Sequence, residues 1–355
     1  MAALYETEND AEASESDSDN DMACIGFMFD TARKKGCECF EFHNSKGELF
    51  TVDLNMIQGD PGHVQSGQYL WPAAHYAVSY LADHVDEFNH LCKNSSEAIS
   101  IVELGAGCGL TALGVSQLFP HRLISCILTD RDYGSLLLLE QNSTQLWERL
   151  SAQAFPMHKS ARMREIAATA QKPGIFASDK ESKGGDSRDN GDEELFPLFT
   201  TAELNWGKPL PEELYKRCCK GSIYRCLEAS STGSTAVATG TQTQAAAAGL
   251  PFQLLLLGSD LLYSEDVVAP LLTTVVQLLT LHSESMGSSK RGVPHLATDA
   301  DMTGIFILTS SFDIGENINL EVSQQADKLK LEIREMNALN VSTATCRVQQ
   351  FRLKQ

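Results

Sequence analysis

The sequence lacks the usual patterns of a metal or disulfide site. Its ten cysteines include no C-x-x-C pair, and its nine histidines include no H-E-x-x-H spacing. We therefore expect no metal site, and we expect reduced thiols in an intracellular protein. No secretory leader precedes the acidic beginning of the chain, and no stretch of about 18 apolar residues exists. Neither secretion nor a membrane span is expected.

Positive charge is also scarce. The formal net charge is −19, and residues 5–22 contain eight acids and no base. This stretch has no apolar periodicity, so the sequence predicts a disordered acidic tail over residues 1–22. The remainder is still acidic, and a phosphate backbone needs a basic face. A nucleic-acid partner is therefore not expected.

The chain after the tail begins with a predicted β extension over residues 23–66. Within it, residues 36–57 have the composition of a β-hairpin around the turn N-S-K-G. Two places are open to this hairpin: the substrate face of the protein and an edge of the main sheet. Residues 66–85 then predict a loop that leads into a helix, with Pro72 in the first helical turn.

The rest of the chain alternates between short apolar runs and helical patterns. Apolar runs without alternation indicate strands that are covered on both faces, and helices between them indicate parallel crossovers. The sequence thus predicts a doubly wound, Rossmann-like α/β sheet whose last strand, from residue 346, is antiparallel. The strands are expected at 98–105, 123–130, 251–260 and 304–312, and the helices at 110–119, 133–150 and 267–282.

Three low-complexity stretches interrupt this pattern within a single predicted domain that spans residues 67–355. They are rich in glycine, serine, threonine, alanine and charge, which is typical of surface insertions. We expect these insertions near residues 151–195, 213–250 and 282–303.

A glycine loop, G-A-G-C-G at residues 105–109, follows the first strand of the alternating region. The dinucleotide fingerprint requires a further glycine at position 110, which is Leu110 here. The loop still lets a ligand approach backbone N–H groups at a helix start. Taken alone it is equally compatible with a structural turn. Asp130, at the end of the next strand, is well placed for ribose hydroxyls and favours a cofactor site.

The sequence resembles a known enzyme family in four stretches: G-Q-Y-L-W-P-A-A-H-Y-A-V-S-Y-L, the region from I-V-E-L-G-A-G-C-G-L to L-L-L-L-E-Q-N, A-E-L-N-W-G-K-P-L, and L-L-L-L-G-S-D-L-L-Y-S-E-D. These are similar to the seven-β-strand protein-lysine methyltransferases of methyltransferase family 16. The D-L-L-Y segment, a D-x-x-Y motif in the family, is the most specific. The resemblance implies a seven-stranded sheet, S-adenosylmethionine (SAM) as the cofactor, and transfer of a methyl group to a lysine ε-amine of a protein substrate.

The resemblance also implies roles for individual residues. Asp260 and Tyr263 match the D-x-x-Y pair beside the substrate lysine, and Asp130 matches the acid that binds the ribose. The remaining expected cofactor contacts lie along the methionine and adenine parts of SAM: Trp71, Glu103, Gly105, Ala106, Gly107, Trp206 and Ser259.

Some residues indicate a functional site independently of the family resemblance. Glu103 lies inside a buried strand, and a buried acid needs a partner. Trp206 lies in a polar, non-periodic stretch, where a packed tryptophan is less expected. For Trp71, packing in the core is as good an explanation as cofactor binding, and Asp260 could simply cap the following loop.

Other functions stay open at this point. They are a small-molecule N-methyltransferase of the same fold, a dinucleotide dehydrogenase, which Leu110 disfavours, and a non-catalytic interaction protein that keeps the fold. We expect a monomer in the cytoplasm, with the nucleus as an alternative location.

Overall fold

The computed structural model describes ten segments of the chain. The described residues are 34–58, 66–86, 98–120, 122–154, 198–212, 214, 252–289, 304–336, 340–341 and 344–354. The predicted acidic tail at 1–22 lies outside these residues, as do most of the three predicted insertions.

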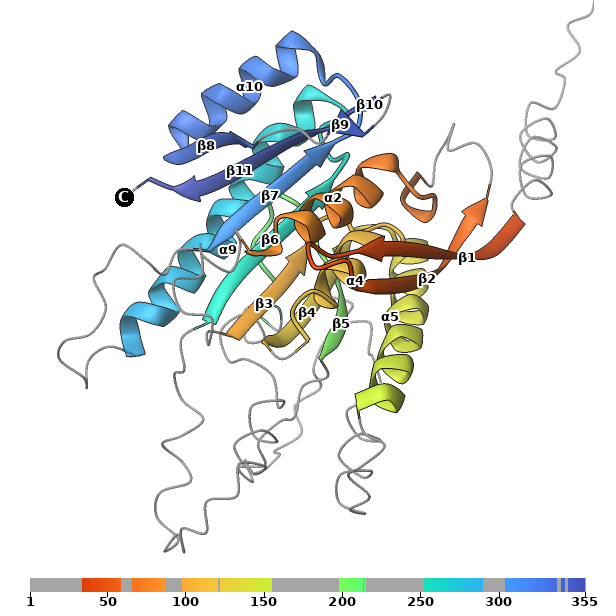
Figure 1. The fold of residues 1–355 in the computed structure, drawn as a ribbon. Helices are drawn as coiled ribbons and strands as arrows, with labels where there is room; N and C mark the ends of the chain where they lie inside the picture. The colour runs from red at the N-terminus through yellow and green to blue at the C-terminus, as the bar shows by residue number, and fades with distance from the viewer. Residues whose placement is uncertain are drawn as a thin grey trace, which may run out of the picture.

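The main sheet has seven strands (Figure 1). β3, β4, β5, β6 and β7 are parallel, while β11 lies antiparallel between β7 and β8. This topology confirms the doubly wound, Rossmann-like fold with an antiparallel last strand. In spatial order, the strands are β5 (Phe199–Glu203), β4 (Leu123–Asp130), β3 (Ala98–Glu103), β6 (Phe252–Ser259), β7 (Ile305–Ser310), β11 (Arg347–Leu353) and β8 (Leu331–Met336).

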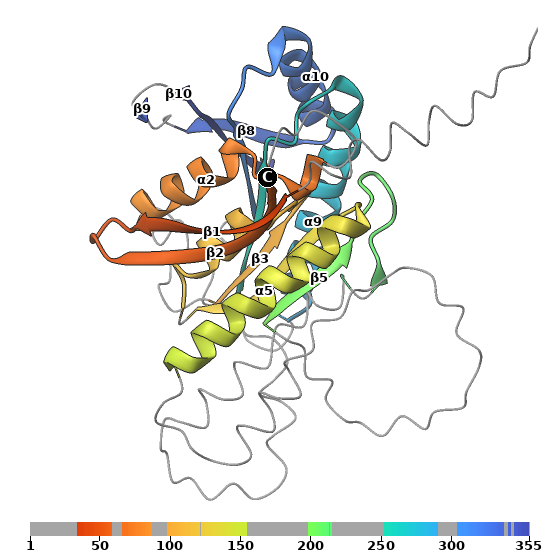
Figure 2. The ribbon, with the colours of Figure 1, turned by 90° about the vertical axis from the view of Figure 1, so that its right-hand side faces the viewer.

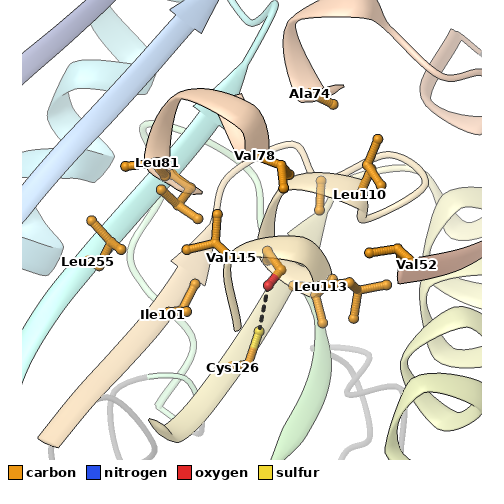
Figure 3. Packing of buried hydrophobic residues seen from close by; sticks show 14 of the residues in the cluster. Val52, Ala74, Val78, Leu81, Ile101, Leu110, Leu113, Val115, Cys126 and Leu255 are labelled. Carbon is orange, nitrogen blue, oxygen red and sulfur yellow. Dashed lines mark hydrogen bonds between the residues drawn. The ribbon is translucent and has the colours of Figure 1, made fainter. Parts of the chain in front are cut away.

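One face of the sheet is covered by α2 (Pro72–Asp83), α4 (Leu110–Ser116) and α5 (Tyr133–Ala154). Their apolar side chains meet those of β3, β4 and β6 in one buried cluster. Figure 3 shows how Val78 and Leu81 of α2 and Val115 of α4 pack over Ile101 and Leu255 of the sheet. This layer fixes the start of α4, where the glycine loop ends.

The opposite face is covered by α9 (Val268–Ser289) and α10 (Gly315–Lys328). Figure 2 shows the sheet nearly edge-on, with α2 on one side and α9 and α10 on the other. Among the described residues, the segment Glu265–Glu284 is long and apolar enough to cross a membrane, with a mean hydropathy of 1.3. Its side chains at Val268, Leu272 and Val275 are fully buried against the sheet. A core helix that packs on a doubly wound sheet has the same length and apolar composition.

The N-terminal strands β1 (Lys34–His43) and β2 (Leu49–Gln58) form the predicted hairpin. The Asn44 carboxamide oxygen accepts hydrogen bonds from the backbone N–H groups of Lys46 and Glu48, which closes the turn. Within the described strands, the hairpin is a separate two-stranded sheet rather than an extension of the main one. It packs across α2, α4 and α5 (Figure 1). Its side chains Val52 and Leu54 are fully buried.

Two polar side chains of α5 hold the hairpin in place. Asn142, which is fully buried, pairs with the backbone N–H and C=O of Asn55 on β2. Arg149 donates to the Asp53 carboxylate at 3.0 Å and to the Thr51 hydroxyl at 2.7 Å. The hairpin is thus tied to α5, the helix that follows β4.

Several elements differ from the prediction. α4 ends at Ser116 rather than 119, because residues 117–119 close with shorter i to i−3 hydrogen bonds. α5 continues through Ala154 and α9 through Ser289, so residues 151–154 and 282–289, which were expected to belong to insertions, are helical. β5, α10 and β8 were not predicted from the sequence pattern. β5 is a short edge strand of sequence F-T-T-A-E, α10 buries only Val322 and Ala326, and β8 is a charged edge strand. Short elements complete the fold: η1 (Ser66–Gln68), η2 (Glu265–Val267), β9 (Asn340–Val341) and β10 (Ala344–Thr345).

Candidate active site

A cavity of about 1030 Å³ opens at the carboxyl ends of the parallel strands. In open α/β sheets this edge is where ligands bind, because the loops there diverge at the point where the strand order reverses. Its walls come from the segments around η1, the loop after β3, the end of β4, the residues after β5, and the ends of β6 and β7.

The glycine loop after β3 forms the floor of the cavity. Gly105, Gly107 and Gly109 all have positive φ angles, of 58°, 55° and 88°. L-residues with side chains avoid this region, which explains the alternation of glycines in the sequence. The Ala106 N–H donates to the Thr129 carbonyl at 2.8 Å, and the loop is thereby tied to β4.

The segment η1 lies across this loop. A Cβ atom on Gly107 would come within 2.6 Å of the Gly67 carbonyl oxygen, so only glycine fits there. The Cys108 thiol donates to the carbonyl of Gln68 at 3.2 Å, and burial raises its pKa to about 12. Cys108 is therefore a neutral hydrogen-bond donor that fastens η1 to the loop, not a reactive thiolate.

Asp130 ends β4 and lines the cavity. Its carboxylate accepts hydrogen bonds from the Gly107 N–H at 3.0 Å and the Asp132 N–H at 2.9 Å. Burial is the main cause that raises its pKa, and these backbone donors oppose the shift. A carboxylate has about four lone-pair sites, so Asp130 keeps acceptor capacity for hydroxyl groups of a ligand.

Glu103 lies behind the glycine loop and is not among the residues that line the cavity. Its carboxylate accepts the Ala112 N–H at 2.9 Å and so satisfies a free donor in the first turn of α4. Complete burial raises its pKa to about 7, and the charge of Asp130 adds to the shift. The structure therefore places Glu103 as a support for the loop, one layer away from the position expected beside the cofactor.

The residues expected near the adenine and methionine parts converge on the cavity. The Trp206 ring packs on the loop, 3.0 Å from where a Gly105 Cβ would lie. Ser259, at the end of β6, accepts a weak hydrogen bond of 3.4 Å from the Thr111 hydroxyl. Trp71, the residue before α2, also lines the cavity and is 36% exposed. This exposure disfavours the alternative that Trp71 is only a core residue.

Asp260 follows β6 with a positive φ of 52° and is 7% exposed. Its carboxylate accepts hydrogen bonds from the Ala73 N–H, the Ser311 N–H and the Ser311 hydroxyl, at 3.1, 2.7 and 2.7 Å. Tyr263 lies three residues on and is 57% exposed at the cavity. The two residues of the D-x-x-Y motif thus meet opposite surroundings, one buried and bonded, the other open.

Several residues of the cavity wall were not predicted, and two of them bear on the chemistry of the site. Phe312, 37% exposed, follows β7, and Asp266 lies in η2 after the D-x-x-Y motif. Phe312 ends the run that the sequence predicts as a strand, and the rule that parallel strands end at the site could have found it. Asp266 carries no such signal, because an acid in a surface turn is ordinary.

The chain has a match among known protein families. Residues 52–153 match the model of a family described as lysine methyltransferase. No curated protein matches the chain.

Solved structures give distant likenesses. They include the N-terminal domain of human METTL16 in complex with SAH, with a TM-score of 0.34 and 10% identity over 81% of this chain and 73% of that one. Another is the rRNA methyltransferase aviRa from Streptomyces viridochromogenes, with a TM-score of 0.31 and 12% identity over 81% and 88%. The chain covers 55% of the CurJ carbon methyltransferase and 57% of a putative SAM-dependent methyltransferase from Streptococcus mutans. Likenesses this remote carry no argument about substrate.

The matched residues 52–153 contain most of β2 as well as η1, α2, the glycine loop and Asp130, of which the last four contribute residues to the cavity. They form the floor and one wall of the cavity described above. The resemblance to a family of lysine methyltransferases is therefore confirmed over residues 52–153.

Proposed function

We propose that this protein is a SAM-dependent methyltransferase that methylates the ε-amine of a lysine in a protein substrate. The observation that carries the proposal is a single cavity in which the glycine loop, Asp130 and Trp206 meet Asp260 and Tyr263. The first set has the chemistry of a nucleoside-containing cofactor site, and the second set resembles the D-x-x-Y motif of lysine methyltransferases.

The residues at the floor of the cavity fit SAM. Gly105 and Gly107 allow the backbone to approach the ligand closely, and Asp130 offers carboxylate oxygens to ribose hydroxyls. Trp206 supplies an aromatic wall of the kind an adenine ring requires. The acids Asp130 and Glu103 also favour a cationic ligand at this end over a phosphate-bearing one.

When bound, SAM supplies a methyl group on a positively charged sulfur, which leaves as a neutral thioether. The protein has to place the acceptor nitrogen in line and exclude water. An amine with a reference pKa near 10.4 costs about 4 kcal/mol to deprotonate at pH 7.4. A partly apolar cavity lowers this cost by disfavouring the charged amine, and aromatic faces at the mouth can hold the ammonium before it loses its proton.

The proposal is tested by transfer of a tritiated methyl group. The purified protein and labelled SAM are added to a lysate that lacks this enzyme, and labelled bands are analysed by mass spectrometry. We expect label on a lysine of one or a few proteins. Label confined to small molecules or RNA would instead support another acceptor class, and a folded protein that fails to bind SAM would refute the proposal altogether.

A variant in the D-x-x-Y motif tests the proposal at a single residue. Asp260→Ala should abolish methyl transfer, while SAM binding, measured by calorimetry, stays mostly intact. An equal loss of both would assign Asp260 to the cofactor pocket or to the stability of the fold.

A further inference from the structure

Asp260 joins three parts of the chain that are distant in sequence. Its own backbone N–H donates to the Thr309 carbonyl on β7 at 2.9 Å. Its carboxylate accepts one hydrogen bond from Ala73, in the first turn of α2, and two from Ser311, just after β7. Three of its roughly four acceptor sites are therefore taken by fixed donors of the protein.

The backbone segments that Asp260 holds both carry an aromatic side chain at the cavity. Trp71 lies two residues before Ala73, and Phe312 directly follows Ser311. Tyr263 comes from the segment of Asp260 itself. One buried carboxylate thus sets the position of three rings from three elements.

We refer to these three cavity-lining rings, Trp71, Tyr263 and Phe312, as the aromatic aperture. They line the same cavity and are 36%, 57% and 37% exposed, which is a high exposure for large apolar side chains. Aromatic faces attract ammonium groups, and they do so more strongly when the cation is partly desolvated. The aperture therefore has the chemistry of a site for a cationic amine.

The charge around the aperture agrees with this occupant. Residues 261–272 and 311–320, which carry Tyr263 and Phe312, contain the exposed acids Glu265, Asp266, Asp313 and Glu316 and no lysine or arginine. The basic residues of the cavity wall, Arg131 and Lys208, come from the segments after β4 and β5 instead. An approaching lysine is protonated at neutral pH and is attracted to such a rim. A neutral or anionic acceptor would gain nothing from it.

We propose that Asp260 is a positioning residue that fixes the aromatic aperture, and that Phe312 and Ser311 determine specificity for the cationic amine of the substrate. In this arrangement Asp260 acts through the backbone of α2 and of the segment after β7. It does not accept the proton of the amine. The inference rests on the proposed function, because it assigns the amine subsite of that same cavity.

The first test separates substrate binding from chemistry. Ser311→Ala removes one donor to Asp260 without touching the cavity wall, and Ser323→Ala, whose hydroxyl bonds only within α10, is the matched control. With the protein substrate found by methyl labelling, we expect Ser311→Ala to raise KM at least fivefold and to leave SAM affinity within twofold. An unchanged KM with a lowered kcat and a shifted pH profile would assign Asp260 to proton transfer and overturn the inference.

The second test uses a defined probe in place of the protein substrate. In the presence of SAH, a trimethyllysine peptide is compared by NMR with its neutral isostere, in which carbon replaces the ammonium nitrogen. We expect at least a tenfold preference for the cation, its loss in Phe312→Ala and its retention in Phe312→Tyr. Leu320→Ala, an exposed apolar residue of α10 outside the cavity wall, should keep the preference.

The outcomes of these tests distinguish failure of the aromatic aperture from failure of the proposed function. Equal binding of cation and isostere, or a preference that survives Phe312→Ala, refutes the aperture even if SAH binds and lysine is labelled. Failure to bind SAM or SAH, or label on another acceptor class, refutes the proposed function instead.

Discussion

The two ends of the cavity recognise their ligands in different ways. At the glycine loop, recognition comes mainly from the backbone: three residues with positive φ, N–H groups, and acids held by backbone donors, with the Trp206 ring packed beside them. At the aromatic aperture, it comes from exposed side chains on three separate elements, and one buried carboxylate sets their positions. The loop end is thus rigid in its main chain, whereas the aperture end depends on which rings the sequence places there.

This difference explains why the sequence motifs at the two ends differ in how specifically they indicate a ligand. A backbone site constrains a few glycines and acids and serves many enzymes that share a cofactor. A side-chain site can change its ligand by single substitutions that leave the main chain intact. The predictions below test how independent the two ends are.

The largest effect is expected at the loop end. Gly107→Ala places a Cβ within 2.6 Å of the Gly67 carbonyl at a φ of +55°. Because the Cβ position is set by the backbone of residue 107 and the carbonyl oxygen is itself main chain, neither atom can move aside freely. We expect SAM affinity to fall by roughly 100-fold or more, as measured by calorimetry. Gly47→Ala is the matched control, since its φ is +75° but nothing lies within 4 Å of the added atom. Similar SAM affinity in the two variants would contradict the account of the loop.

Glu103 predicts a pH dependence of stability. Its pKa is raised to about 7 by burial, so the folded protein holds this proton more tightly than the unfolded chain does. The free energy of unfolding should therefore fall as pH rises from about 4.5 to 7, by an amount on the order of 3 kcal/mol. Urea denaturation at several pH values measures this slope.

Glu103→Gln should flatten that part of the pH profile, because the amide oxygen can still accept the Ala112 N–H but carries no charge. SAM should also protect wild-type protein more strongly above pH 7, where the ionised carboxylate favours a cation. A slope that persists unchanged in Glu103→Gln would assign it to Asp130 or another group.

Asn142 links the hairpin to the loop end. Its side chain pairs with Asn55 of β2 and donates to the Cys108 carbonyl at 2.9 Å. Asn142→Ala leaves these buried groups without a partner, and we expect the free energy of unfolding to fall by about 2 kcal/mol with weaker SAM binding. The cation preference of the aperture, measured with the SAH-saturated variant, should stay within twofold. A loss of that preference would mean that the two ends are coupled through the hairpin.

The smallest effect is expected from Tyr263→Phe at the aperture. The ring face is retained, and phenylalanine and tyrosine attract cations comparably, so we expect kcat/KM to change by only about twofold. Tyr263→Ala, which removes the ring, should raise KM in the same way as Phe312→Ala. A large loss in Tyr263→Phe would assign a role to the hydroxyl group rather than to the ring.

Much of the fold was predictable because local patterns carry it. The strand at 123–130 ends at Asp130 as predicted, since a run of apolar residues closed by an acid marks the end of a covered strand. The turn at Asn44 and the helix that begins at Pro72 follow from the conformational preferences of single residues. α10 and β8 escaped prediction because each buries few side chains and leaves a weak apolar pattern.

The sequence by itself determined the floor of the cavity. Glycines at alternate positions after a strand and an acid at the next strand end require particular backbone conformations, and those requirements are local. Only the tertiary structure decided that Glu103 lies behind the loop, that Asp260 is bonded to α2 and to Ser311, and that Phe312 stands at the cavity with Trp71. These contacts join residues that are as many as 187 positions apart, and no local preference encodes where such distant segments meet.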